Sequence, residues 1–168
     1  WAIAGTVLLI AVFFVFRGRV KLAGGFSGRL MPRFNGLERF AHWLTAVSFI
    51  VQALTGLNIM FGRYFIKSLF GVEAFAAITL WGKYLHNFVA FSFMAGVILI
   101  IVLWLRDNLP DRYDLHWLAK AGGLLSDKGE HPPARKFNAG QKLIFWFVVL
   151  GGILVSLSGI ALLFPYEF

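Results

Sequence analysis

Two histidines, His42 and His86, lie within apolar stretches that hold no Asp, Glu, Lys or Arg. An imidazole placed in hydrocarbon must find a partner, and ionisable groups at membrane depth mark functional sites by default. One isolated histidine of this kind is explained by a hydrogen bond to a neighbouring helix, but a pair is harder to explain in that way. Neutral imidazole is also a common ligand of metals and of haem iron. Both histidines are therefore candidate ligands.

The surroundings of the two histidines repeat. Arg39 precedes His42 by three positions, and Lys83 precedes His86 by three. Residues at this spacing share one face of a helix, so each cation would lie one turn nearer the membrane interface. A haem propionate would emerge at that level. The alternative is that Arg39 and Lys83 are ordinary snorkelling anchors at helix ends.

The elements that carry these residues are predicted to be transmembrane helices. The chain is 59% apolar and 14% charged, whereas a soluble domain carries roughly 25% charged residues. Four stretches contain no charged residue, namely 1–16, 40–61, 84–105 and 143–165. A spanning helix needs about 20 such residues. We predict an all-α integral membrane bundle with four spans. The first stretch is shorter and could be a signal segment, but basic residues follow it where a cleavage site would be expected.

The depths of the histidines leave room for two haems stacked across the bilayer. His42 lies about three residues inside the second predicted helix, and His86 lies about two to five residues inside the third from the opposite side. At a rise of about 1.5 Å per residue, their depths differ by roughly 18 to 22 Å. Gly56 and Gly96 lie deeper in the same helices. They could let a porphyrin approach the backbone, or they could serve helix packing.

Basic residues predict the orientation of the chain. Residues 17–39 hold six Lys or Arg and residues 106–142 hold seven, whereas the connection between the second and third helices holds three. Because Lys and Arg are retained on the cytoplasmic side, 17–39 and 106–142 are expected to face the cytoplasm. The net charge of +8 then reflects contact with anionic lipid headgroups and requires no nucleic acid.

Absent residue types exclude several chemistries. The chain has no Cys, so it cannot ligate an Fe–S cluster or attach a c-type haem covalently. The eight acidic residues are expected in loops or at helix ends, Glu38 among them, which leaves no buried carboxylate for a proton-coupled transporter. The long connection 106–136 is expected to hold a short interfacial helix around Leu115, Trp117 and Leu118, extending to Leu124 and Leu125. We expect its histidines, His116 and His131, to lie at the surface.

Four short motifs resemble the cytochrome b (gamma) subunit of bacterial membrane-bound respiratory formate dehydrogenase. They are 39–43 (RFAHW), 83–86 (KYLH), 108–118 (NLPDRYDLHWL) and 137–142 (FNAGQK). The resemblance covers roughly 33–166. We therefore expect residues 1–30 to form an extra N-terminal transmembrane helix with a basic loop, and residues 31–168 to form the di-haem cytochrome b domain.

The resemblance implies two b haems, each held between two histidines. His42 would serve the haem on the cytoplasmic side and His86 the haem on the periplasmic side. It also implies a quinone pocket to which Asn138, Gly140 and Gln141 contribute. An amide side chain and free N–H groups at a helix start can hydrogen-bond a quinone carbonyl, although Asn138 could equally be a plain N-cap. Lysine stands at position 83, where arginine is frequent in the family. Lysine keeps the positive charge but cannot bind a propionate through two parallel hydrogen bonds, as arginine can.

The function implied is electron transfer in the bacterial inner membrane. Electrons from formate, oxidised on a molybdenum or tungsten catalytic subunit, would pass through a partner's Fe–S clusters and the two haems to quinone. The cytochrome b subunit of a hydrogenase or of another molybdoenzyme would share the histidines. A non-redox membrane anchor or transporter would share only the helices. Assembly into a higher oligomer is left open.

A fifth helix is predicted beyond Phe168, because these residues supply one histidine for each haem and the family carries the other two on a last helix. A depth difference of roughly 20 Å corresponds to about 13 or 14 residues of helix, which also returns the chain to nearly the same face. We expect two histidines at that spacing. The remainder of the gene tests this: a chain that ends near Phe168, or a next helix without the pair, contradicts the two-haem reading of a single subunit.

Overall fold

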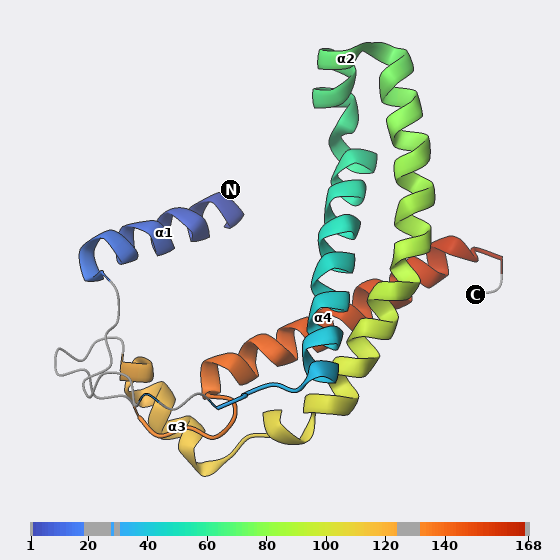
Figure 1. Cartoon of the computed structure of the whole chain (residues 1–168). Coiled ribbons are helices and arrows are strands. Elements are labelled where there is room, and N and C mark those ends of the chain that lie inside the picture. Colours follow the sequence, from blue (N-terminus) through green and yellow to red (C-terminus); the bar gives the residue numbers. More distant parts are fainter. Residues whose placement is uncertain (1, 19–27, 29–30, 124–131, 167–168) are drawn as a thin grey trace. The chain divides into compact units, whose positions relative to one another are not determined.

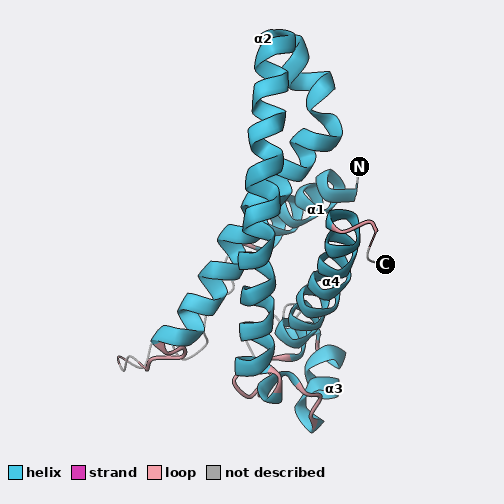
Figure 2. Cartoon of the chain, turned by 90° about the vertical axis from the view of Figure 1, so that its right-hand side faces the viewer, coloured by secondary structure: helices cyan, strands magenta, loops and turns pink. Residues whose placement is uncertain are grey.

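The computed structural model describes residues 2–18, 28, 31–123 and 132–166. Within them the chain forms four α-helices and two short 3-10 turns (Figure 1): α1 (Ala2–Arg17), α2 (Gly36–Trp104), η1 (Arg106–Asn108), α3 (Arg112–Ala119), η2 (Ala121–Gly123) and α4 (Ala139–Leu163). Figure 2 shows helices and loops, with no strand among the described residues. The predicted all-α class is confirmed.

The described residues divide into two compact units. One unit draws on 1–31 and 110–140, and therefore contains α1 and α3. The other draws on 32–109 and 141–168, and contains α2 with nearly all of α4. The predicted division of the chain near residue 30 stays a prediction.

Helix α2 is a hairpin of two antiparallel arms, 36–70 and 72–104, which meet at Gly71 (Figure 1). Gly71 has φ 84° and ψ 177°, a conformation that is essentially restricted to glycine. The sequence predicted a connection between spans at Arg63, Lys67 and Lys83, but both arms stay helical through it. Lys and Arg are good helix formers, so their charges end a hydrocarbon span without ending the helix.

Each arm is longer than a membrane core is thick. An arm of about 34 residues rises roughly 50 Å, against about 30 Å of hydrocarbon. On the first arm, exposed Trp43 and Tyr64 are separated by a rise of about 31 Å. On the second arm the exposed rings of Trp81 and Tyr84 lie 6.0 Å apart. Aromatic residues at two such levels are typical of membrane interfaces. In a membrane whose interfaces lie at these two levels, the Gly71 end of the hairpin would extend beyond the hydrocarbon.

The first arm contributes small and polar side chains to the seam between the arms. On the first arm, buried Ala41, Thr45 and Ser48 recur every three or four residues, and half-buried Gln52 and Thr55 continue the row. Large apolar side chains point outward instead, among them Phe40, Val47, Phe49, Ile50 and Leu54. This arrangement is the reverse of a soluble helix pair, and it suits lipid as the outer solvent.

The remaining apolar helices differ in length. Helix α4 has 25 residues and is long and apolar enough to cross a membrane, as predicted for 143–165. It begins a turn earlier than expected and includes buried Lys142. Helix α1 has 16 residues and rises about 24 Å, short of a full core. The count of four spans stays a prediction.

Replacing Gly71 with alanine is expected to lower the free energy of unfolding by about 1–3 kcal/mol, because a Cβ is strained at φ 84°. No neighbouring atom lies within 4 Å of the added Cβ, so the effect comes from the backbone alone. Unfolding by denaturing detergent measures it. Gly159→Ala is the matched control, since Gly159 also has open space but lies in helix α4 at ordinary φ. Equal stability of the two variants would contradict the strain argument.

Candidate functional site

His86 lies half-buried in the seam and is held by three residues of the facing arm. Its ring Nδ1 is 2.8 Å from the hydroxyl oxygen of Thr55. The Gln52 side-chain amide donates to the backbone carbonyl of His86 at 2.5 Å. A Cβ added to Gly56 would lie 3.4 Å from Cε1 of the His86 ring, so the ring edge rests against this glycine. The imidazole is thus fixed in level and orientation.

His42 lies on the outer side of the first arm and is exposed. Its ring meets that of Trp43 edge-on, with centroids 5.5 Å apart. Within the described part of the chain, His42 makes no hydrogen bond, and the exposed side chains of Arg39 and Lys83 make neither a hydrogen bond nor an ion pair. These three groups are available to a ligand.

The contacts of His86 fix its distance from His42 along the hairpin. Because His86 bonds to Thr55, the two residues lie at the same level. His42 precedes Thr55 by about 13 residues on the same arm, a rise of roughly 20 Å. This value falls within the range of 18 to 22 Å expected from the sequence.

Gly96 serves the packing of the arms. A Cβ on Gly96 would lie 2.5 Å from the Thr45 hydroxyl oxygen and 3.1 Å from the Thr45 backbone. Backbone atoms cannot give way, so the arms approach this closely only because residue 96 has no side chain. Of the two interpretations offered by the sequence, helix packing therefore accounts for Gly96.

The predicted quinone residues lie at the start of α4. Asn138 directly precedes the helix and is half-buried, as is Gln141 in the first turn. The Gln141 side-chain oxygen accepts a hydrogen bond from Arg33 at 3.0 Å. A Cβ on Gly140 would lie 2.9 Å from the Trp117 ring, so this glycine makes room for the indole. The sequence placed Trp117 only in an interfacial helix and gave no signal for this contact.

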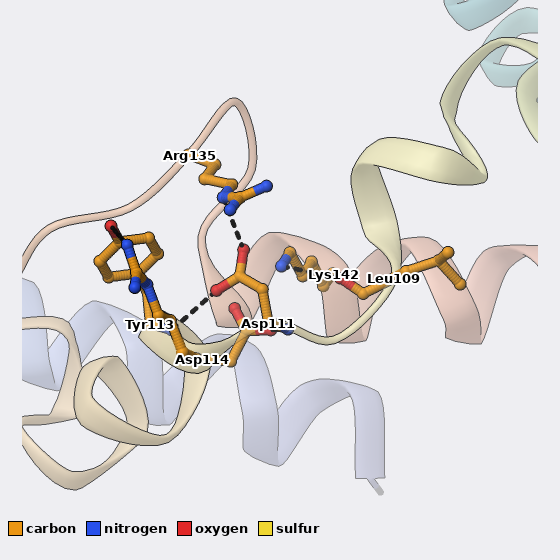
Figure 3. Close-up of polar contacts among 7 residues, drawn as sticks. Leu109, Asp111, Tyr113, Asp114, Arg135 and Lys142 are labelled. Carbon is orange, nitrogen blue, oxygen red and sulfur yellow. Dashed lines mark hydrogen bonds and ion pairs between the residues drawn. The ribbon is translucent and has the colours of Figure 1, made fainter.

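The connection before α4 contains the short helix that the sequence predicted. It is α3 (Arg112–Ala119), and Asp111 caps it by accepting from the Tyr113 N–H at 2.7 Å while also pairing with Arg135 at 3.5 Å (Figure 3). His116 is exposed on α3, as expected. His131, Leu124 and Leu125 lie outside the described residues.

A buried polar cluster where the second arm ends was not predicted. The Glu38 carboxylate is 6% exposed and accepts from the indole N–H of Trp104 at 2.8 Å. Asn108, 1% exposed, donates from its side-chain amide to the Trp104 carbonyl, and its backbone carbonyl accepts from the Trp146 indole at 3.1 Å. Buried Lys142 donates to the Leu109 carbonyl at 3.0 Å (Figure 3).

The prediction that no carboxylate is buried is therefore wrong for Glu38. Glu38 lies inside the first turn of α2, where Asn35 caps the helix and the Glu38 side chain accepts from the Asn35 N–H at 2.8 Å. The two N–H donors compensate the desolvation of the charge. A capping box, with Asn three residues before Glu, is the signal that could have located this residue.

Comparisons with known proteins give a family and several relatives. The profile of the prokaryotic cytochrome b561 family matches residues 33–168. The formate dehydrogenase cytochrome b556(fdo) subunit of Escherichia coli (strain K12) is 29% identical over 135 residues, which cover 80% of this chain and 61% of the relative. The nitrate-inducible cytochrome b556(Fdn) subunit of the same strain is 26% identical over 143 residues, covering 83% and 63%.

A third relative, the formate dehydrogenase cytochrome b556 subunit of Haemophilus influenzae, is 26% identical over 125 residues, covering 73% of this chain and 50% of the relative. The chain thus spans less than two thirds of the length of these relatives. The resemblance that the motifs suggested is confirmed.

Proposed function

The chain belongs to the prokaryotic cytochrome b561 family, and from this premise we propose that it is the membrane cytochrome b subunit of a respiratory formate dehydrogenase. It would take electrons from the Fe–S clusters of a partner subunit and deliver them to quinone. The relatives whose names contain formate dehydrogenase support the choice of complex. Formate itself would be oxidised on a separate molybdenum or tungsten subunit.

The observation that carries the proposal is the placement of His42 and His86 on one hairpin, roughly 20 Å apart along its axis. The residues present fit a haem at each level. His86 has one ring nitrogen engaged by Thr55, which leaves Nε2 for iron, and His42 has an exposed ring. Haem b bound at these histidines supplies a reversible one-electron redox step.

The side chains near each histidine have defined tasks in this proposal. His42 and His86 would each hold one haem through an imidazole nitrogen, and the second ligand of each haem would come from another part of the complete protein. Arg39 and Lys83, three residues earlier on the same helix faces, would pair with propionates. Their exposure and freedom from other ion pairs within the described residues support this assignment.

The start of α4 is the proposed quinone site. The N–H groups of the first turn of a helix have no partner four residues earlier, so that of Gly140 can donate to a quinone carbonyl. The Gln141 side chain lies in the same turn. The Asn138 amide can add a further donor, and the Trp117 ring beside Gly140 offers an apolar surface for a flat ring. These residues would bind and orient the acceptor.

The basic segments 17–39 and 106–142 would face the cytoplasm of a bacterial inner membrane. The Gly71 end of the hairpin would then project on the periplasmic side, where the Fe–S partner delivers electrons. A cytochrome b subunit of a hydrogenase is the second candidate, and the three formate dehydrogenase relatives favour the first.

The proposal predicts that His42→Ala removes one haem from the complete enzyme and abolishes quinone reduction, because the haem at that level would lose one of the residues that hold it. Formate oxidation with an artificial acceptor should survive, since it occurs on another subunit. A reduced-minus-oxidised absorption spectrum and both activity assays measure this outcome.

His116→Ala is the matched control, since His116 is exposed on α3 and outside the apolar spans. Both haems and full quinone reduction are expected in this variant. Quinone reductase activity at the wild-type level in His42→Ala, or a wild-type protein without haem absorption, would refute the ligand assignment.

Asn138→Leu should leave both haems in place and slow their oxidation by quinone up to about tenfold, because one hydrogen bond is lost. Stopped-flow oxidation of the reduced complex measures the rate. Asn138→Ser is the control, because serine keeps the helix cap but not the amide. If quinone oxidises the haems of Asn138→Leu as fast as those of the wild type, Asn138 is only a helix cap and does not bind quinone.

A further inference from the structure

The Thr55 hydroxyl makes two close contacts that together assign the proton on His86. Its oxygen lies 2.6 Å from the carbonyl oxygen of Val51, one helical turn earlier, and 2.8 Å from Nδ1 of His86. The carbonyl of Gln52 is a weaker third neighbour at 3.2 Å. Each close contact between electronegative atoms requires one proton between them.

Only one arrangement of protons satisfies both contacts. A carbonyl oxygen has no proton to give, so the proton between Thr55 and Val51 must be that of the Thr55 hydroxyl. The hydroxyl has no second proton. The contact with His86 must therefore be bridged by a proton on the imidazole Nδ1, which donates to the Thr55 oxygen. In neutral imidazole the other nitrogen, Nε2, then carries the free lone pair.

We propose that Thr55 is a positioning residue which fixes His86 in the tautomer that presents Nε2 to haem iron. This inference rests on the proposed function. Gln52 and Gly56 complete the setting, because the first holds the His86 backbone and the second gives the ring edge a flat surface. Thr55 thus acts on the iron through the histidine and touches no reacting group.

The hydrogen bond also sets how strongly His86 donates to the metal. A ligand histidine that donates its other N–H becomes a more basic ligand, and a more basic ligand favours the oxidised iron. Thr55 therefore lowers the reduction potential of the haem at His86. His42 makes no such bond within the described residues, so the two haem sites differ in this respect.

Thr55→Val in the complete enzyme tests the inference. Valine keeps the shape of the side chain and removes the acceptor. We expect a redox titration followed by visible absorption to show a higher potential for the His86 haem, with the ratio of reduced to oxidised haem raised up to about tenfold, which is about 59 mV for one electron. The low-spin electron paramagnetic resonance signal of that haem should shift as well, and the His42→Ala variant identifies which signal it is.

Two further variants separate the hydrogen bond from general effects on the helix. Thr55→Ser keeps the hydroxyl and should restore the wild-type potential. Thr45→Val removes a hydroxyl that makes the same type of bond, to the Ala41 carbonyl at 2.8 Å, on the same arm and away from His86. It should leave the His86 haem unchanged.

An unchanged potential and resonance signal in Thr55→Val overturns the inference, as does a Thr55→Ser variant that behaves like valine. Loss of the haem in Thr55→Val with retention in Thr55→Ser supports it. A wild-type complex without b-type haem would instead overturn the proposed function, so the two failures are distinguishable.

Discussion

The structure depends on hydrogen bonds that polar side chains make in the seam between the two arms of α2. In hydrocarbon, a polar side chain must find its partner within the protein, and the α2 hairpin provides partners for Thr45, Gln52 and Thr55. Thr45 bonds to the Ala41 carbonyl on its own arm, and Gln52 bonds across the seam to the His86 carbonyl. Small residues such as Gly96 allow the arms to approach closely enough for these bonds. Lipid drives the apolar side chains outward, and the polar row then determines how the arms align.

The alignment of the arms determines how far apart His42 and His86 lie along the hairpin. Because Gln52 and Thr55 both hold His86, the second arm cannot slide along the first without breaking two hydrogen bonds. A displacement by one residue would also rotate His86 by about 100° away from the seam. The separation of roughly 20 Å from His42 is therefore a property of the seam. The hairpin itself orients His86, whereas His42 is exposed on the outer side of the first arm.

Much of this arrangement could be predicted from the sequence, because it depends on long apolar runs and on two histidines within them. The helices over 40–61, 84–105 and 143–165 follow from the scarcity of charge. The continuation of α2 through Lys67 could not be predicted in this way, because a hydropathy pattern detects where hydrocarbon ends and not where a helix ends. The contact of Trp117 with Gly140, and the bond between Thr55 and His86, join residues distant in sequence. Pairings of this kind depend on tertiary packing, and local patterns in a single sequence do not reveal which distant residues meet.

The buried carboxylate of Glu38 bears on the choice between an electron carrier and a proton-coupled transporter. A carboxylate that carries protons must exchange partners as it titrates. In this structure one Glu38 oxygen accepts from the Trp104 indole and the other from the Asn35 backbone, within a helix capping box. The bond with Trp104 joins the beginning of the first arm to the end of the second, and Gly71 closes the opposite end. Glu38 therefore fixes the open end of the hairpin, and its burial is a consequence of the same alignment that places His86. The buried acid is accounted for by the architecture of a cytochrome, and it requires no transport function.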